Sequence, residues 1–339
     1  MTDYQKYREE FESFLDEGGN IYIGSNFDEP PSYILFEMDE TAYNEQLREY
    51  VDQKKEDFPQ VVYDSFPAPI AYFYHQTERA YDNEQHRLQL LRSTWEALIY
   101  VLYGLVLGEV NVKGFSLNNV RIFDGQKIKQ DHRGLMSDKL GWKVEAMEKI
   151  IEYDKQNQNE LKISSCINTG TFELIKELNQ GRNSFSHIAA LSEQEAKERY
   201  DELSPKVLDL LFELDFLENV SLLRYVNNLG DIHKVRFNKF GGHSLQKQNY
   251  DITLSDPDLS LCTSILNNQC ILIEFNSVFN VSPFIHFYHE GSQIKLCYFK
   301  KIDSAGNYLF ELIGGTNREI AINPTHIPNC INVSLGALL

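Results

Sequence analysis

Apolar residues spaced for helices dominate the middle of the chain. Two helices are predicted over Ile70 to Val110, and the second begins at Asn83, whose side chain suits an N-cap. The second helix carries apolar residues at three- and four-residue spacing, namely Leu88, Leu91, Trp95, Leu98, Leu102 and Leu105. This spacing is typical of a helix with one buried face.

Further helices are predicted downstream. One covers about Lys139 to Asp154, and another covers Thr171 to Leu178 before Gly181. Ser192 and Glu195 form a capping box, which begins a helix that reaches about residue 217 with a kink or restart at Pro205. We therefore expect a helical domain over residues 65–222.

The two ends of the chain follow other patterns. Residues 1–64 open with an amphipathic helix over Tyr4 to Leu15, followed by two expected strands, IYIG and SYILFEM, and a polar helix from about Thr41 to Lys55 that leads to a break at Pro59. Residues 223–339 contain the β-branched and aromatic runs ILIEF, FIHFYH, IKLCYF and YLFELI, separated by turn residues. The predicted class is α+β: a small α/β appendage, a helical bundle and a C-terminal β-rich domain.

Charge and composition argue against several classes of function. With 32 basic and 50 acidic residues the formal charge is -18, which argues against wrapping long nucleic acid by bulk electrostatics. The longest apolar stretch, Ala97 to Val110, is shorter than the roughly 20 residues of a membrane span, and the N-terminus lacks the pattern of a secretory signal. Five scattered cysteines favour neither disulfides nor a zinc cage. We expect a cytoplasmic protein with no cofactor, since nucleotide-binding, zinc-protease and esterase motifs are also absent from the sequence.

The candidate chemistry lies between two predicted helices, in the segment GRNSFSH. Arg182 and His187 are five residues apart, which in a regular helix places them roughly 140° apart on different faces. RNA supplies its own 2′-hydroxyl nucleophile, so one imidazole for proton transfer and one guanidinium for the phosphate are enough to cleave it. The simpler alternative is that both cations only stabilise the end of the preceding helix.

This motif resembles that of the HEPN family, in which Arg, a polar residue and a later His precede the last helices of a small bundle. Arg182, Asn183 and His187 match it, and the segments PAPIAYFYHQTERA, RLQLLRSTWEALIYVL, LGWKVEAMEKI and NVSPFIHFYHEG look similar to a module of bacterial defence proteins over about residues 65–315. The resemblance implies a metal-independent endoribonuclease that acts as a dimer. We expect it to leave 2′,3′-cyclic phosphate ends and to serve as a toxin-like effector in antiphage defence. A regulatory or sensor protein encoded nearby is a further candidate partner, and whether such a protein restrains the enzyme is left open by the sequence. The alternative is a catalytically inert HEPN-like scaffold or sensor subunit.

Other residues are candidates around this site. Asn183 is expected to fix His187 or a phosphate, and Glu96 is expected either to orient Arg182 or to lie on a solvated helix edge. Two basic groups are candidate RNA contacts: Lys127, Lys129 and Arg133 in a predicted loop or hairpin, and Lys234, Arg236 and Lys239 in a run that equally suits a solvated loop.

Two further expectations concern metal and assembly. His286, His289 and Cys297 invite a metal site, but residues three apart on a strand point to opposite faces, so none is predicted. Because each chain supplies one motif, acid and base roles at one phosphate predict a homodimer. Its interface is expected on the apolar helix from Trp95 to Leu107 and on Leu208, Leu210, Leu211 and Phe212.

Overall fold

The structure is a computed structural model of an α+β chain, with a helical region followed by two small antiparallel sheets. It describes residues 4–22, 28–114, 120, 136, 139–157, 160–180, 188–231, 233–264, 271–274, 278–291, 293–314 and 319–323. Contacts within the chain divide it into residues 1–61 and residues 62–339. The predicted domain boundaries near residues 64 and 222 stay a prediction.

The first unit is mainly helical. Its elements are η1 (Tyr4–Tyr7), α1 (Arg8–Asp16), β1 (Ile21–Tyr22), β2 (Asp28–Glu29), α2 (Pro31–Met38) and α3 (Glu40–Ser65), the last of which continues into the second unit. The predicted amphipathic helix is confirmed over Arg8–Asp16, whereas Tyr4–Tyr7 form a 3-10 helix. Phe11 packs edge-on against Tyr43 at a ring-centroid distance of 5.4 Å.

Two predictions for this unit are wrong. The SYILFEM run forms helix α2, because Pro31 occupies its first turn and the Asp16 carboxylate accepts hydrogen bonds from the Ser32 N–H and hydroxyl, both at 2.8 Å. Helix α3 also passes through Pro59, where buried Phe58 and Val62 offset the missing backbone hydrogen bond.

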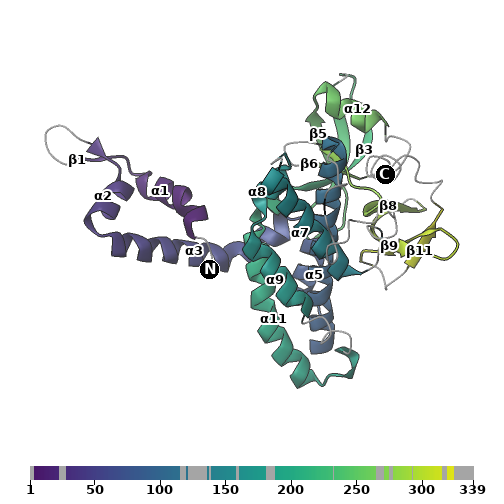
Figure 1. The fold of residues 1–339 in the computed structure, drawn as a ribbon, viewed down its shortest axis with the longest axis horizontal. Helices are drawn as coiled ribbons and strands as arrows, with labels where there is room; N and C mark the ends of the chain where they lie inside the picture. The colour runs from purple at the N-terminus through teal and green to yellow at the C-terminus, as the bar shows by residue number, and fades with distance from the viewer. Residues whose placement is uncertain are drawn as a thin grey trace. The chain divides into compact units, whose positions relative to one another are not determined.

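The second unit begins with packed helices (Figure 1). They are α4 (Ala68–Arg79), α5 (Glu84–Lys113), α7 (Leu140–Asn157), α8 (Lys162–Cys166), α9 (Thr169–Gln180), η3 (Ile188–Ala190), α11 (Glu193–Glu213) and η4 (Asp215–Asn219). The predicted starts of α5 and α11 are confirmed, since Asn83 accepts a hydrogen bond from the His86 N–H at 2.8 Å and Ser192 with Glu195 forms the capping box. Helix α11 continues past Pro205 without ending there.

Helix α5 is the centre of the second unit. It contacts α4, α7 and α11, and it also contacts strand β8 of the C-terminal part. Among the described residues it alone is long and apolar enough to cross a membrane, and 83% of that apolar window is buried inside the fold. The expected dimer interface on Trp95 to Leu107 is therefore wrong, because the chain itself covers these side chains. The expectation that Leu210, Leu211 and Phe212 contribute to that interface is wrong for the same reason.

The C-terminal part forms two antiparallel sheets. The five-stranded sheet has the order β5-β4-β3-β6-β7, built from β3 (Ser221–Asn228), β4 (Lys234–Phe240), β5 (Gln248–Thr253), β6 (Ile271–Glu274) and β7 (Val278–Asn280), with helix α12 (Asp256–Ser264) between β5 and β6. The four-stranded sheet has the order β11-β10-β9-β8, built from β8 (Ile285–Glu290), β9 (Gln293–Ile302), β10 (Tyr308–Leu312) and β11 (Glu319–Ile322). The four predicted strand runs are confirmed.

Aromatic side chains join the sheets to α5. Tyr100 stacks on Tyr298 with ring centroids 4.8 Å apart, and Tyr103 meets Phe284 edge-on at 5.2 Å. Gly104 of α5 faces Phe284 and Ile285, and a Cβ added to it would lie at an ordinary contact distance of 3.7 Å from both side chains. Because these large rings are buried against one another, helix α5 and the strands of the C-terminal part share one hydrophobic core.

Candidate functional site

The predicted catalytic residues occupy the segment between α9 and η3. Helix α9 ends at Gln180 and η3 begins at Ile188, so Arg182, Asn183 and His187 lie outside the described residues. Their roles stay predictions. The structure describes the helical elements on either side of this segment, which are α9 and η3.

The chain after the motif is attached to the start of α5. Gln85 donates a hydrogen bond from its amide to the Leu191 carbonyl at 3.0 Å, and the backbone N–H of Glu84 donates to the Glu193 carboxylate at 3.0 Å. Ile188 is buried. The segment that follows His187 is therefore anchored through both its backbone and its helix cap.

The chain before the motif is fixed by α9. Phe172, Ile175 and Leu178 are buried on one face of that helix, which packs against α7 and α11. Beside this face, Lys176 pairs with Glu148 of α7 at 2.5 Å, and Lys206 of α11 pairs with Glu177 at 2.7 Å. Both ends of the motif segment are thus held by packed helices of one bundle.

Arg87, Tyr200 and Glu78 form a cluster where α4, α5 and α11 meet, which the sequence did not indicate. The Arg87 guanidinium covers the Tyr200 ring at 3.8 Å and donates to the Glu78 carboxylate at 3.1 and 3.2 Å. Tyr200 donates its hydroxyl to the same carboxylate. Burial opposes the charge of Arg87, but Tyr200 and Glu78 outweigh it and raise the pKa of Arg87. Because this arginine is fully engaged, we interpret it as a structural clamp.

Glu96 has a described partner other than Arg182. Its carboxylate accepts a hydrogen bond from Nε of Arg92, one helical turn earlier on α5, at 2.8 Å, and both side chains are about a quarter exposed. This is the ordinary i,i+4 helix pair, which stabilises by only a few tenths of a kcal/mol. The expected orienting role toward Arg182 stays a prediction.

The two expected groups of RNA-binding residues differ in what the structure describes. Lys127, Lys129 and Arg133 lie outside the described residues. Lys234, Arg236 and Lys239 lie on strand β4, so the solvated-loop alternative is wrong.

The residues on β4 do not form one basic patch. Buried Val235 and Phe237 alternate with the cations, and the strand pleat places Lys239 on the face opposite Lys234 and Arg236. Arg236 makes a bidentate pair with Asp251 at 2.7 Å for both contacts, while Lys239 covers the ring of Tyr250 at 5.3 Å. Two of the three cations are therefore engaged within the sheet.

The histidines of β8 have different surroundings. His286 is buried and opposite Cys297, and its Nδ1 lies 3.2 Å from the Ser282 hydroxyl. Burial, with a smaller effect of His289, lowers the pKa of His286 to about 4. Across the described parts of the chain, no three His, Cys, Asp or Glu side chains are grouped as metal ligands.

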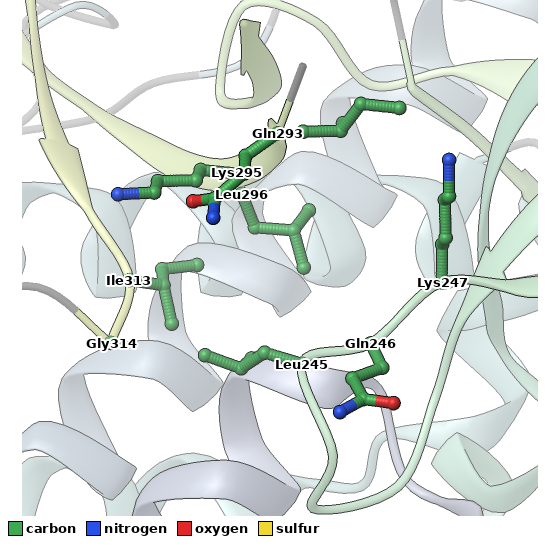
Figure 2. Close-up of a pocket in the computed structure, with 9 residues that line it drawn as sticks. Leu245, Gln246, Lys247, Gln293, Lys295, Leu296, Ile313 and Gly314 are labelled. Carbon is green, nitrogen blue, oxygen red and sulfur yellow. The ribbon is translucent and has the colours of Figure 1, made fainter. Parts of the chain in front are cut away.

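A cleft that the sequence did not indicate opens between the loop after β4 and the start of β9 (Figure 2). Its volume is about 560 Å³, and its lining comes from three chain segments: Leu245, Gln246 and Lys247; Gln293, Ile294, Lys295 and Leu296; and Ile313 and Gly314. Figure 2 shows the side chains of Leu245, Leu296 and Ile313 pointing into the cavity, with Lys247 and Lys295 on opposite sides of it. This combination of apolar walls and a few polar groups is typical of small-molecule sites.

The loop that forms one wall of the cleft is fixed at its base. The Gly242 and His243 N–H groups donate to the carbonyls of Phe66 and Tyr63 at 2.8 and 2.7 Å. The His243 ring stacks on His75 of α4 with ring centroids 4.2 Å apart. The wall is therefore preformed, which reduces the entropy cost of binding a ligand there.

Comparison with known proteins identifies no relative of this chain. No family model, no curated protein and no solved structure matches it. The HEPN resemblance therefore rests on the motif and its neighbouring segments alone.

Proposed function

We propose that this chain is a metal-independent endoribonuclease of the HEPN type, with Arg182 and His187 as its catalytic residues. The observation that supports the proposal is the anchoring of residues on either side of the motif. Gln180 ends a packed helix and Ile188 begins the next helical element, so the two ends of the motif segment are fixed in one bundle. Positioned acid, base and phosphate-binding groups are what RNA cleavage requires.

The proposed reaction needs no group beyond the chain and the RNA. One histidine takes the proton from the 2′-hydroxyl as its oxygen bonds to phosphorus, and the bond from phosphorus to the 5′-oxygen breaks. A second histidine protonates that leaving oxygen, and a 2′,3′-cyclic phosphate remains. Arg182 stabilises the charge on the phosphorane, because a guanidinium offers paired donors to two phosphate oxygens. Asn183 orients His187 or the phosphate.

The two histidines are proposed to come from two copies of the chain, which makes the active form a homodimer. The apolar surfaces of α5 and α11 do not provide that interface, because they are buried within each chain. The contact is instead proposed to include the motif segments themselves, related by a two-fold axis. The partner would be a second copy of this chain, and the substrate an RNA.

The test is cleavage of single-stranded RNA by the full-length protein in EDTA. We expect 2′,3′-cyclic phosphate ends, and a loss of at least about 100-fold in rate for Arg182→Ala and for His187→Ala. Matched controls are Arg79→Ala, an exposed arginine of α4, and His233→Ala, a partly exposed histidine before β4, both expected to keep full activity. Circular dichroism and thermal unfolding are to be measured for all four variants, so that a loss of activity can be separated from a loss of folding.

Two outcomes would contradict the nuclease proposal. Cleavage that requires a divalent metal would exclude this mechanism. A folded chain that cuts no RNA, but whose biological effect survives both alanine substitutions, would identify the bundle as an inert scaffold or sensor.

A further inference from the structure

Helix α2 of the N-terminal unit, Pro31–Met38, carries apolar side chains that the fold does not bury. Large apolar residues fill the run Tyr33 to Phe36 and recur at Met38, yet Ser32 is the only residue of this helix that is buried. A helix that is apolar on every side is normally buried inside a protein. Helix α2 departs from that rule and leaves an apolar surface for a further contact.

One side of α2 is fixed to its own unit. Phe36 packs edge-on against Tyr43 of α3 at 5.2 Å, and the Arg8 guanidinium lies 5.2 Å from the centre of the Phe36 ring. Ser32, one turn before Phe36, donates hydrogen bonds from its N–H and hydroxyl to the Asp16 carboxylate. Ser32 and Phe36 thus define the inner side of the helix. Because α2 is held in place before a partner binds, less entropy is lost on binding.

The opposite side of α2 faces away from these contacts. Ile34 and Met38 are one turn apart and lie about 200° around the helix from Ser32 and Phe36. Met38 is 82% exposed, the largest value for an apolar side chain in the described part of the chain. Tyr33, which is 49% exposed, lies between the two sides. We call Tyr33, Ile34 and Met38 the α2 face.

The sequence around the α2 face is strongly acidic. Between Arg8 and Arg48 it contains 11 acidic residues and no lysine, arginine or histidine. Phe14 and Ile21, which are also exposed, belong to the same stretch. Residues 1–61 have 16 acidic and 5 basic residues, a formal charge of -11, whereas the other 278 residues have 34 and 27, a formal charge of -7. The negative charge of the protein is therefore concentrated where apolar side chains are exposed.

Carboxylates beside the α2 face are available to a cation from outside the chain. Glu37 and Glu40, at the end of α2 and the start of α3, are exposed and form no ion pair with another described residue. Two of the five basic residues of the unit are already paired, Arg8 with Glu12 at 2.8 Å and Lys54 with Glu10. The unit itself thus supplies little positive charge to neutralise this surface.

We propose that the α2 face binds a cationic amphipathic segment of a partner protein, with the apolar side of that segment on Tyr33, Ile34 and Met38 and its cations near Glu37 and Glu40. An exposed apolar surface with a polar rim is typical of protein-binding sites, and opposite charges steer two partners together. A second copy of this unit would bring a charge of -11 against -11, and an anionic membrane would be repelled in the same way. The charge therefore favours a basic protein partner.

The test is fluorescence anisotropy of a labelled amphipathic helical peptide of leucine and lysine, titrated with the full-length protein. We expect a Kd of about 1–100 μM at low salt. Binding is expected to weaken at least about 10-fold when sodium chloride rises from about 50 mM to about 500 mM, because salt screens exposed charges. A peptide of the same pattern with glutamate in place of lysine is expected not to bind.

Two double variants test the apolar and the charged parts of the surface separately. Tyr33→Ser with Met38→Ser is expected to weaken binding of the cationic peptide at least about 10-fold, because the apolar contact is lost. Glu37→Gln with Glu40→Gln is expected to weaken it about threefold and to reduce its salt dependence. All four side chains are exposed, so thermal unfolding is expected to stay unchanged.

Matched controls change exposed side chains outside the N-terminal unit. Val112→Ser alters an apolar residue of α5 that is 48% exposed, and Glu198→Gln with Glu202→Gln removes two exposed carboxylates of α11. Both are expected to leave peptide binding unchanged. Since binding is measured without RNA, the proposal does not rest on the nuclease proposal.

Three results would overturn the proposal directly. They are no binding of the cationic peptide up to about millimolar concentration, equal binding of the glutamate peptide, and binding that neither double variant weakens. Two others would assign the surface to a different occupant and overturn the proposal as well. Self-association of the free protein that Tyr33→Ser with Met38→Ser abolishes would indicate a second copy, and loss of binding to phosphatidylglycerol vesicles in the same variant would indicate a membrane.

Discussion

Acid is expected to destabilise this protein above all through His286, although burial also lowers the pKa of His75 and of His289. The His286 ring is 3% exposed, lies 5.5 Å from the ring of Phe310, and has the Ser282 hydroxyl as its polar neighbour at 3.2 Å. Its pKa falls from 6.5 to about 4, mainly because burial disfavours the charged ring. The unfolded chain therefore takes up a proton at a higher pH than the folded chain does, and stability falls as the pH drops below about 6.5.

The size of the effect follows from the two pKa values. Each pKa unit corresponds to about 1.4 kcal/mol, so the interval between 6.5 and about 4 removes about 3 kcal/mol in total. About 2 kcal/mol of that loss falls between about pH 7 and about pH 5. This is a large part of the free energy of unfolding of an ordinary domain.

Urea unfolding of the wild type and of His286→Asn over this pH range measures the effect. Asparagine places an amide near the position of Nδ1, so it keeps a polar group for Ser282 but does not titrate. We expect His286→Asn to be less stable at neutral pH and to lose about 2 kcal/mol less than the wild type on acidification. The control is His233→Asn at a partly exposed position. Equal acid sensitivity of wild type and His286→Asn would refute the reasoning.

Two other predictions follow from close contacts and from the motif. Gly242→Ala is expected to destabilise the fold by at least about 2 kcal/mol, because the φ of Gly242 is +69° and the added carbon would lie 2.9 Å from the Asp64 carbonyl oxygen. Gly104→Ala is expected to stabilise the fold by about 0.5–1 kcal/mol, because the added carbon would meet Ile285 at an ordinary contact distance of 3.7 Å. Urea unfolding compares the two, and equal effects would contradict the geometry. Wild-type chains mixed with His187→Ala chains are expected to form heterodimers with far less than half the wild-type RNase activity per dimer; retention of half would mean that each chain carries a complete site.

Local signals made the helices of the second unit predictable. Helix α5 has both a sustained apolar period and a side chain at Asn83 that caps its first turn, so its start and its buried face follow from neighbouring residues. Helix α2 was not predictable in this way. Its run of Tyr, Ile, Leu and Phe suits a strand, and its helical state depends in part on Asp16, which caps it from another helix.

The candidate sites differ in the same respect. Arg182 and His187 could be chosen from residue type and spacing within seven positions, and their role stays a prediction. The cleft could not be predicted from local sequence, because it depends on which strands pair and in which register. Cleft residues from 245 to 314 meet only after the hairpins form, and no periodicity encodes that meeting.

The central position of α5 has a consequence for the newly made chain. Its residues Tyr100 and Tyr103 are covered by side chains that follow residue 283, so they wait for a part of the sequence that is synthesised much later. At about 5–20 residues per second, synthesis of the chain from Lys113 to Ile285 takes roughly 10–35 s. During that time the segment Glu84–Lys113, which has the length and hydropathy of a membrane span, lacks its contacts with the sheets. Because transiently exposed apolar surface promotes aggregation, the yield of folded chain is expected to depend on protection of this helix until the sheets are made.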